Sequence, residues 1–219
     1  MSVNLKDYYE AYWSADQPVP DQDPTTGERK QRLRAALSGL DRRERILDMG
    51  CGSGQFVSFI ASLGYEARGV DVSQAAIDRA RRTHPSLAFD VLVREQIPFP
   101  EEHFAAVWSS EVLEHVFDVH NHLSEINRVL VHGGRYVLTT PYHGRVKDVL
   151  VALLRFDGHF DPEKSHIRFF DRAGLRRCLE RAGFTIRQYA GIGRFWPLYR
   201  TWFVVAEKTG QPLTRPREQ

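Results

Sequence analysis

The chain has 219 residues, of which 42% are hydrophobic and 26% charged, and its formal net charge is +2. This length suits one large domain with small additions, and it argues against a multidomain protein. Because acidic and basic residues are interspersed along the chain, the charge pattern argues against a nucleic-acid partner.

The two cysteines, Cys51 and Cys178, lie in dissimilar sequence contexts and form neither a disulfide framework nor a metal site. The first ten residues lack an apolar leader, and no stretch reaches the apolar length of a membrane span. We therefore expect a cytoplasmic protein with no metal ion and no stable membrane insertion.

The first forty residues are predicted to be an appendage to the main domain. Tyr8, Tyr9 and Trp13 gather near the start, a stretch rich in Pro, Asp and Gly covers 18–27, and a charged run with helical spacing covers 28–40. The aromatic side chains either close over a ligand as a lid or pin the N-terminus to the core.

From residue 45 onward, short apolar runs of β type alternate with amphipathic helical runs. This alternation predicts a Rossmann-like α/β domain over 41–209, with a mostly parallel sheet and helices on both faces. The predicted strands are 45–49, 67–71, 87–92, 105–109 and 134–140. The predicted helices are 54–63, 74–82 and 121–130, the last ended by Gly133 and Gly134.

After Pro141 the alternation breaks, and we expect an insertion at about 142–170 that sets substrate specificity. It holds a predicted amphipathic helix at 146–156 and a polar loop at 157–166. Asp171 is expected to cap a helix that runs to Ala182. Strands at 184–189 and 201–207 then close the sheet, and 210–219 is expected to be a flexible tail.

A glycine loop follows the first predicted strand, and an acid ends the second. Gly50, Gly52 and Gly54 let bare backbone approach a ligand at the carboxyl end of the strand. About twenty residues later, Asp71 can accept hydrogen bonds from two ribose hydroxyls. Together these residues predict a nucleoside-containing ligand, whereas the alternative is a tight turn with a capped helix.

Charge and spacing distinguish the nucleoside ligands. The third glycine of a dinucleotide fingerprint is replaced by Gln55, and Asp48 would repel a pyrophosphate. The same carboxylate suits a ligand that carries an ammonium and a sulfonium. S-adenosylmethionine has both cations and no phosphate.

Several collinear stretches between about 44 and 140 strengthen this interpretation. They resemble the class I S-adenosylmethionine-dependent methyltransferases, in particular the small-molecule subgroup that includes the ubiquinone-biosynthesis O-methyltransferases. The resemblance implies a seven-stranded sheet with an antiparallel last strand, and conversion of S-adenosylmethionine to S-adenosylhomocysteine. The stretches are 46–56 (ILDMGCGSGQF), 69–73 (GVDVS), 97–100 (IPFP), 107–116 (VWSSEVLEHV) and 126–130 (INRVL).

The resemblance also implies roles for residues. The methionine moiety would lie on Asp48 and the loop Gly50–Gly54, which includes Cys51, and the ribose on Asp71, with Val72 against the adenine. Ser110 and Glu111 would lie beside the transferring methyl group. The family's usual acid for the adenine amino group is replaced by Val93, so the adenine contacts would come from backbone or from Glu95, next to Arg94.

An oxygen acceptor needs its proton removed, and histidine is best suited to that at neutral pH. His166 is our first candidate, with the alternative that it packs against the following helix, and His143 is the second. His115 and His159 are further candidates. The remaining histidines are predicted to be solvated: His84, His103, His120, His122 and His132.

We expect a small-molecule, lipid-linked or sugar acceptor, methylated at oxygen, and a monomer or a homodimer. The alternatives are an N- or C-methyltransferase, an inactive S-adenosylmethionine-binding protein, and an NAD or nucleotide-sugar enzyme. Residues 194–200 form either an apolar wall for the acceptor or a buried strand connection.

Overall fold

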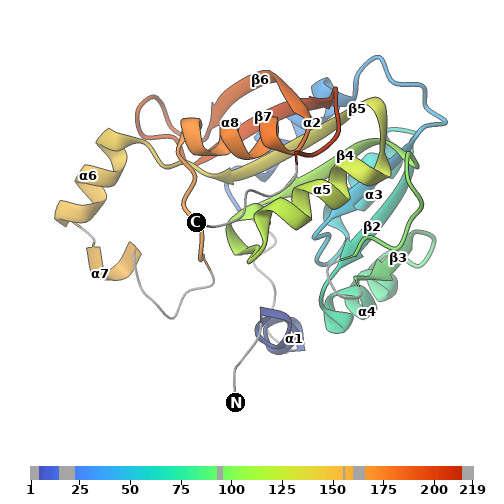
Figure 1. Ribbon diagram of the computed structural model, residues 1–219. Coiled ribbons are helices and arrows are strands. Elements are labelled where there is room, and N and C mark those ends of the chain that lie inside the picture. Colours follow the sequence, from blue (N-terminus) through green and yellow to red (C-terminus); the bar gives the residue numbers. More distant parts are fainter. Residues whose placement is uncertain (1–4, 15–22, 93–95, 155, 160–165, 214–219) are drawn as a thin grey trace.

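A computed structural model describes residues 5–14, 23–92, 96–154, 156–159 and 166–213. Its centre is a seven-stranded sheet in the order β3-β2-β1-β4-β5-β7-β6 (Figure 1). β7 runs antiparallel to both β5 and β6, and the other neighbouring pairs are parallel. The predicted fold class is confirmed. The strands are β1 (Arg45–Met49), β2 (Glu66–Asp71), β3 (Ala88–Val91), β4 (Phe104–Ser110), β5 (Leu130–Pro141), β6 (Phe184–Ile192) and β7 (Thr201–Lys208).

Helices cover both faces of the sheet. On one face, α2 (Thr26–Leu37), α3 (Gln55–Ser62) and α4 (Gln74–Thr83) contribute Leu33, Ile60 and Ile77 to an apolar cluster with the strands. On the other face, α5 (Val119–Val129) and α8 (Arg172–Arg181) contribute Leu123 and Leu175. β1 therefore becomes a central strand that is buried on both sides from Ile46 onward.

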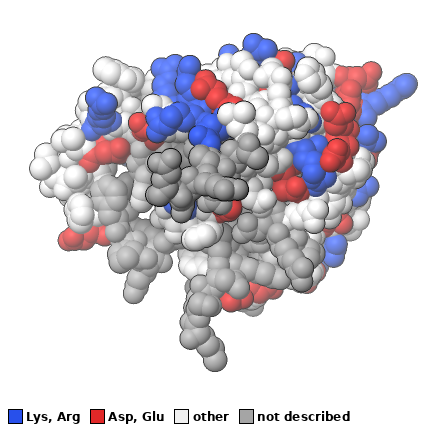
Figure 2. Space-filling model, viewed as in Figure 1, with Lys and Arg blue, Asp and Glu red and all other residues white. Residues whose placement is uncertain are grey.

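Three further helices lie outside these two layers. α1 (Leu5–Ser14) lies at the carboxyl ends of the parallel strands and packs against α4 (Figure 1). α6 (Arg145–Leu154) and α7 (Phe156–His159) follow β5 and lie on the side of the molecule away from β3 and α4 (Figure 1). Charges of both signs are interspersed over the face shown in Figure 2, and uncharged side chains predominate around α6.

Several predicted boundaries were wrong. The helix predicted at 121–130 begins earlier, because the Asp118 side chain accepts a hydrogen bond from the Asn121 backbone N–H at 3.0 Å and caps it. Gly133 and Gly134 do not end this helix but lie within β5, which pairs with β4 from Leu130 onward and shifts register before Arg135. The helix predicted at 146–156 corresponds to α6, which begins at Arg145 and is described up to Leu154, and residue 155 lies outside the described residues.

The described part of the predicted flexible tail is held in place. The Leu213 backbone N–H donates to the Arg181 carbonyl at 2.8 Å, and the Leu213 carbonyl lies 2.9 Å from His120 Nε2. Gly210 is tied to the loop after α8, where its N–H donates to the Gly183 carbonyl at 3.0 Å. Residues 210–213 thus contact the loop after α8 and His120 on α5, the flexible tail stays a prediction, and 214–219 lie outside the described residues.

The strand order reverses between β1 and β4, which are neighbours in the sheet although two strands separate them in sequence. Loops that leave two such strands turn to opposite faces of the sheet and open a crevice at the carboxyl ends. The glycine loop after β1 and the Ser110-Glu111 segment after β4 both meet at this crevice.

Candidate functional site

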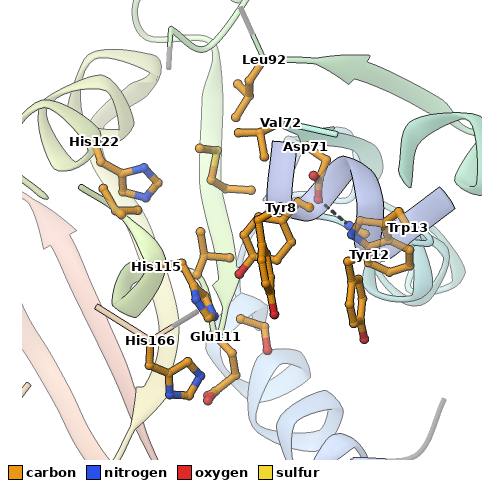
Figure 3. A pocket seen from close by; sticks show the side chains of 17 residues that line it. Tyr8, Tyr12, Trp13, Asp71, Val72, Leu92, Glu111, His115, His122 and His166 are labelled. Carbon is orange, nitrogen blue, oxygen red and sulfur yellow. Dashed lines mark hydrogen bonds between the residues drawn. The ribbon is translucent and has the colours of Figure 1, made fainter. Parts of the chain in front are cut away.

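A cavity of about 410 Å³ occupies this crevice (Figure 3). Its walls come from α1, the loops after β1, β2 and β4, η1 (Leu113–His115), α5 and the segment before α8. The lining residues are Tyr8, Tyr9, Tyr12, Trp13, Met49, Gly50, Gly52, Asp71, Val72, Leu92, Ser110, Glu111, Val112, His115, Val116, His122 and His166.

The glycine loop forms one wall by backbone alone. Gly50 has a φ of +76° and Gly52 a φ of +50°, a region that residues with a Cβ rarely adopt. A Cβ on Gly50 would collide with the Val112 side chain, and one on Gly52 would lie 2.8 Å from the Trp13 ring. The loop therefore requires glycine both for its conformation and for its close contacts.

Asp71 brings a carboxylate to the cavity at the end of β2. Its Oδ2 accepts a hydrogen bond from the Gly52 backbone N–H at 3.0 Å, and its Oδ1 accepts one from the Ser73 N–H at 3.0 Å. Burial raises the pKa of Asp71, and these backbone donors oppose that effect. The side chain is thus held in one orientation and lines the cavity next to Val72 (Figure 3).

Three of the predicted cofactor residues lie behind the wall and not on it. Asp48 is only 2% exposed, and its Oδ2 has no hydrogen-bond partner among the described residues. Burial, and secondly Asp71, raise the pKa of Asp48 well above its usual range. Cys51 packs into the apolar cluster with α3, and a Cβ on Gly54 would meet the Phe89 ring. These residues shape and support the loop.

Ser110 and Glu111, predicted from the resemblance, line the cavity beside β4. Glu111 has a φ of +55°, and its Oε1 accepts a hydrogen bond from Thr201 Oγ1 at 2.6 Å. A strained backbone that is held by a second strand is a device for fixing one side chain in place. Glu111 therefore presents a positioned carboxylate at the end of the cavity opposite Leu92 (Figure 3).

Arg29 stands behind this carboxylate, and the sequence analysis missed it. Its guanidinium is 7% exposed and donates to Asp23 Oδ2 at 2.9 Å and to Ser110 Oγ at 3.2 Å. Its Nη2 also lies 3.5 Å from Glu111 Oε1. Arg29 belongs to a charged run that resembles a solvated helix face, so its burial follows only from the packing of α2 on the sheet.

His115 and His166 form a pair at the same end as Glu111, with ring centroids 4.8 Å apart (Figure 3). The pairing arises because the backbone N–H groups of Ile167 and Arg168 both donate to the Glu114 carbonyl at 3.0 Å. The Glu114 side chain is buried beneath the pair, and its pKa is raised by burial and by Glu111.

The potential ligand atoms of Glu114, His115 and His166 lie within 4.8 Å of one another, a spacing that could hold a metal ion. The sequence analysis predicts no metal ion, and it offers no local signal for this cluster, because His166 lies 51 positions after His115 and 52 after Glu114. The tertiary fold alone creates the cluster.

His143, the second candidate base, does not line this cavity. It is buried, its Nδ1 lies 3.2 Å from Asp148 Oδ1, and its ring contacts the Phe169 ring edge-on at 4.9 Å. The candidates Arg94 and Glu95, and the side chain of His159, lie outside the described residues.

The aromatic residues of α1 close the cavity from the side of solvent. Glu10, on the same helix, accepts hydrogen bonds from Ser73 Oγ at 2.9 Å and from the Ala75 backbone N–H at 3.1 Å. A carboxylate at the N-terminus of α4 is also favoured by the helix dipole. The two alternatives for this segment are thus compatible, since α1 is pinned to α4 while Tyr8 and Trp13 line the cavity.

His122 was predicted to be solvated, and that prediction was wrong. Its side chain is buried, and it lines the cavity from α5. The spacing of Val119, His122, Leu123 and Ile126 places all four on one helical face, which could have revealed the burial.

The loop between β6 and β7 also differs from expectation. Phe195 is 70% exposed and Trp196 is 71% exposed, so the buried strand connection does not describe these two rings, and the apolar wall for the acceptor stays a prediction. They form no buried strand connection and are absent from the described cavity lining.

The charge of the cavity fits one class of nucleoside. Asp71 and Glu111 line it, and its described lining contains no lysine or arginine. A pyrophosphate would lack a counter-charge there, whereas a sulfonium or ammonium would meet carboxylates and aromatic rings. The bare backbone of Gly50 and Gly52 lets such a ligand approach the cavity wall closely.

Comparison with known proteins agrees with this geometry. A family model described as a methyltransferase domain matches residues 25–189. The ubiquinone biosynthesis O-methyltransferase of Alkalilimnicola ehrlichii is 33% identical over 80% of this chain and 72% of its own length. The bifunctional biotin biosynthesis protein BioHC of Cellvibrio japonicus is 32% identical over 64% of this chain, and the match covers only 28% of that protein.

Among solved structures, the geranyl diphosphate C-methyltransferase of Streptomyces coelicolor, in complex with Mg²⁺, geranyl diphosphate and S-adenosyl-L-homocysteine, superposes with a TM-score of 0.70. The match covers 94% of this chain and 98% of that one, at 15% identity, and so shows a shared fold. Within the described helices of our chain, none combines the length and apolar character that crossing a bilayer requires.

Proposed function

Starting from the fact that this chain belongs to the class I S-adenosylmethionine-dependent methyltransferases, we propose that it methylates a small-molecule or lipid-linked acceptor at oxygen. When bound, S-adenosylmethionine supplies an electrophilic methyl group on a sulfonium. One observation carries the proposal: the same cavity holds carboxylates for a cationic nucleoside and, at one end, the pair His115 and His166.

In this proposal the cavity holds the cofactor along its length. Asp71 accepts the ribose hydroxyls, Val72 lies against the base, and the backbone of Gly50 and Gly52 receives the methionine moiety. Glu111 then faces the cationic end. The support is that Gly50, Gly52, Asp71, Val72 and Glu111 all line one continuous cavity.

His166 accepts the proton of the acceptor hydroxyl on a ring nitrogen, and His115 beside it orients the ring. The Tyr9 ring meets His115 edge-on at 5.6 Å and excludes water from this end. Alignment in such a dry pocket supplies about 7–11 kcal/mol of the barrier reduction, and a general base adds about 10²–10⁴-fold in rate.

Replacing the base should separate turnover from cofactor binding. His166→Ala is expected to lower kcat by about 100-fold or more, while calorimetry gives a Kd for S-adenosylhomocysteine within about twofold of the original. His143→Ala, whose ring faces Asp148 and Phe169, should leave kcat nearly unchanged. If kcat falls in His143→Ala and stays unchanged in His166→Ala, the general base is His143 and not His166.

The acceptor class is tested by transfer of radiolabelled methyl from S-adenosylmethionine to panels of phenols, alcohols, sugars and amines. α6 has exposed apolar side chains, which supports an apolar or lipid-linked acceptor. The helix lies near the Glu111 end of the cavity, since Lys147 on α6 interacts electrostatically with Glu111. Label recovered only on nitrogen or carbon would contradict oxygen methylation while retaining the enzyme class.

A further inference from the structure

His122 is a buried polar residue at the apolar end of the cavity. It faces Val72 and Leu92 across the space in which a base would lie (Figure 3). Asp71, at the tip of β2, immediately precedes Val72, so a base attached to a ribose on Asp71 would extend toward this end. This placement rests on the cofactor assignment of the proposed function.

The His122 ring has an unused hydrogen-bonding atom. The side chain is 6% exposed, and its Nε2 is buried without a hydrogen-bond partner among the described residues. Leaving a buried polar atom unsatisfied costs about 1–3 kcal/mol. An unsatisfied buried atom in a native site needs an explanation, and for one that faces a ligand cavity a bound ligand supplies the partner.

The helix that carries the ring is anchored, and the ring is uncharged. Leu123 and Ile126 anchor α5 in the apolar core next to the sheet, and the His122 backbone N–H donates to the Asp118 carbonyl at 3.0 Å. Burial lowers the pKa of His122 to about 4, so the imidazole is neutral at pH 7. A neutral imidazole nitrogen offers one hydrogen bond without repelling a neutral base.

We propose that His122 determines the specificity for adenine: its ring Nε2 accepts a hydrogen bond from the 6-amino group of the cofactor. Val72 and Leu92 contact the apolar faces of the base, and His122 meets its polar edge. This contact replaces the acid that the family usually provides after β3, where this chain has Val93.

The test compares two ligands on four proteins by calorimetry. The ligands are S-adenosylhomocysteine and its deamino analogue, in which hydrogen replaces the 6-amino group. The proteins are the original chain and the variants His122→Phe, His122→Gln and His120→Phe. His120 lies on the same helix, near Leu213, and serves as the matched control.

We expect the original chain to prefer S-adenosylhomocysteine over the deamino analogue by about tenfold, the effect of one hydrogen bond. His122→Phe should lower the affinity for S-adenosylhomocysteine five- to tenfold and leave the affinity for the analogue within about twofold of the original, so the preference disappears. His122→Gln, whose amide oxygen can accept the same bond, should restore most of it. His120→Phe should retain the full preference.

An unchanged preference in His122→Phe would overturn the inference, and a loss of preference in Glu95→Gln would then assign the contact to Glu95. If a thermal melt shows that His122→Phe does not fold, His122→Leu makes the same comparison with a smaller side chain.

An Asp71→Asn variant separates this inference from the proposed function. Unchanged binding in Asp71→Asn would refute the cofactor site itself, whereas weakened binding with an unchanged preference in His122→Phe would refute only the role of His122.

Discussion

The glycine loop after β1 and helix α6 after β5 differ in how they are built. At the glycine loop, the chain is buried on both sides of the sheet, and the backbone conformation of Gly50 and Gly52 forms the cavity wall. In α6, which follows β5, none of the ten residues is buried, and Leu153 and Leu154 are each 76% exposed. The shape of the glycine loop therefore depends on the packed core, whereas α6 lies on the surface of the protein.

This difference indicates which parts of the enzyme can accept sequence changes. The cofactor wall cannot change without disturbing β1 or β4, because its atoms belong to the backbone that leaves those strands. The α6 segment can change its side chains without disturbing the sheet. A family can therefore retain one cofactor while its acceptors diverge, and function has to be argued from the site and not from the fold.

The largest expected effect comes from truncating the core beneath the glycine loop. Leu47, on β1, is fully buried, and Leu47→Ala removes its side chain from a packed cluster. We expect the free energy of unfolding to fall by about 2–5 kcal/mol, measured by urea denaturation. A loss below about 1 kcal/mol would show that this end of the sheet is no better packed than α6.

The next effect concerns the loop itself. Gly50→Ala introduces a Cβ at a φ of +76° and against Val112. The strain should lower the free energy of unfolding by about 1–3 kcal/mol and displace the cavity wall. The affinity for S-adenosylhomocysteine, measured by calorimetry, should then fall by at least about tenfold. Gly27→Ala is the matched control, since a Cβ there meets nothing within 4 Å. Equal affinities in both variants would contradict the role of the loop.

Asp48 should make the apoprotein sensitive to pH. Burial raises its pKa, so the folded state binds the proton more tightly than the unfolded chain. The protonated carboxyl therefore stabilises the fold below the unfolded pKa, and this contribution is lost as the pH rises through the raised value. Asp48→Asn cannot titrate, so its stability relative to the original chain should increase as the pH rises through the folded-state pKa of Asp48.

Denaturation curves of the two proteins between about pH 4 and pH 8 give this difference directly. Parallel curves over the whole range would show that Asp48 titrates as an ordinary carboxyl.

The smallest effect on stability is expected in α6. The double variant Val149→Ser and Leu153→Ser changes two exposed side chains, so the free energy of unfolding should stay within about 0.5 kcal/mol. Affinity for S-adenosylhomocysteine should also be unchanged, while KM for an apolar acceptor rises. A large loss of stability would place α6 in the core and remove the contrast between the two regions.

Local sequence signals determined much of this protein. The alternation of apolar strands and amphipathic helices predicted the sheet, and the glycine spacing with Asp71 predicted the cavity, because each of these signals is contained in a single strand–helix–strand stretch of the sequence. The Asp171 cap was predicted for the same reason, and its Oδ1 accepts the Gly174 backbone N–H at 2.6 Å.

The tertiary structure alone decided which side chains from distant segments meet. His115 and His166 pair through backbone hydrogen bonds to Glu114, and Arg29 reaches Ser110 across 81 positions of sequence. It also decided that Asp48 lies behind the cavity and His122 within it. The physical reason is that burial and contact depend on how helices pack onto the sheet, a property that no short stretch of sequence contains.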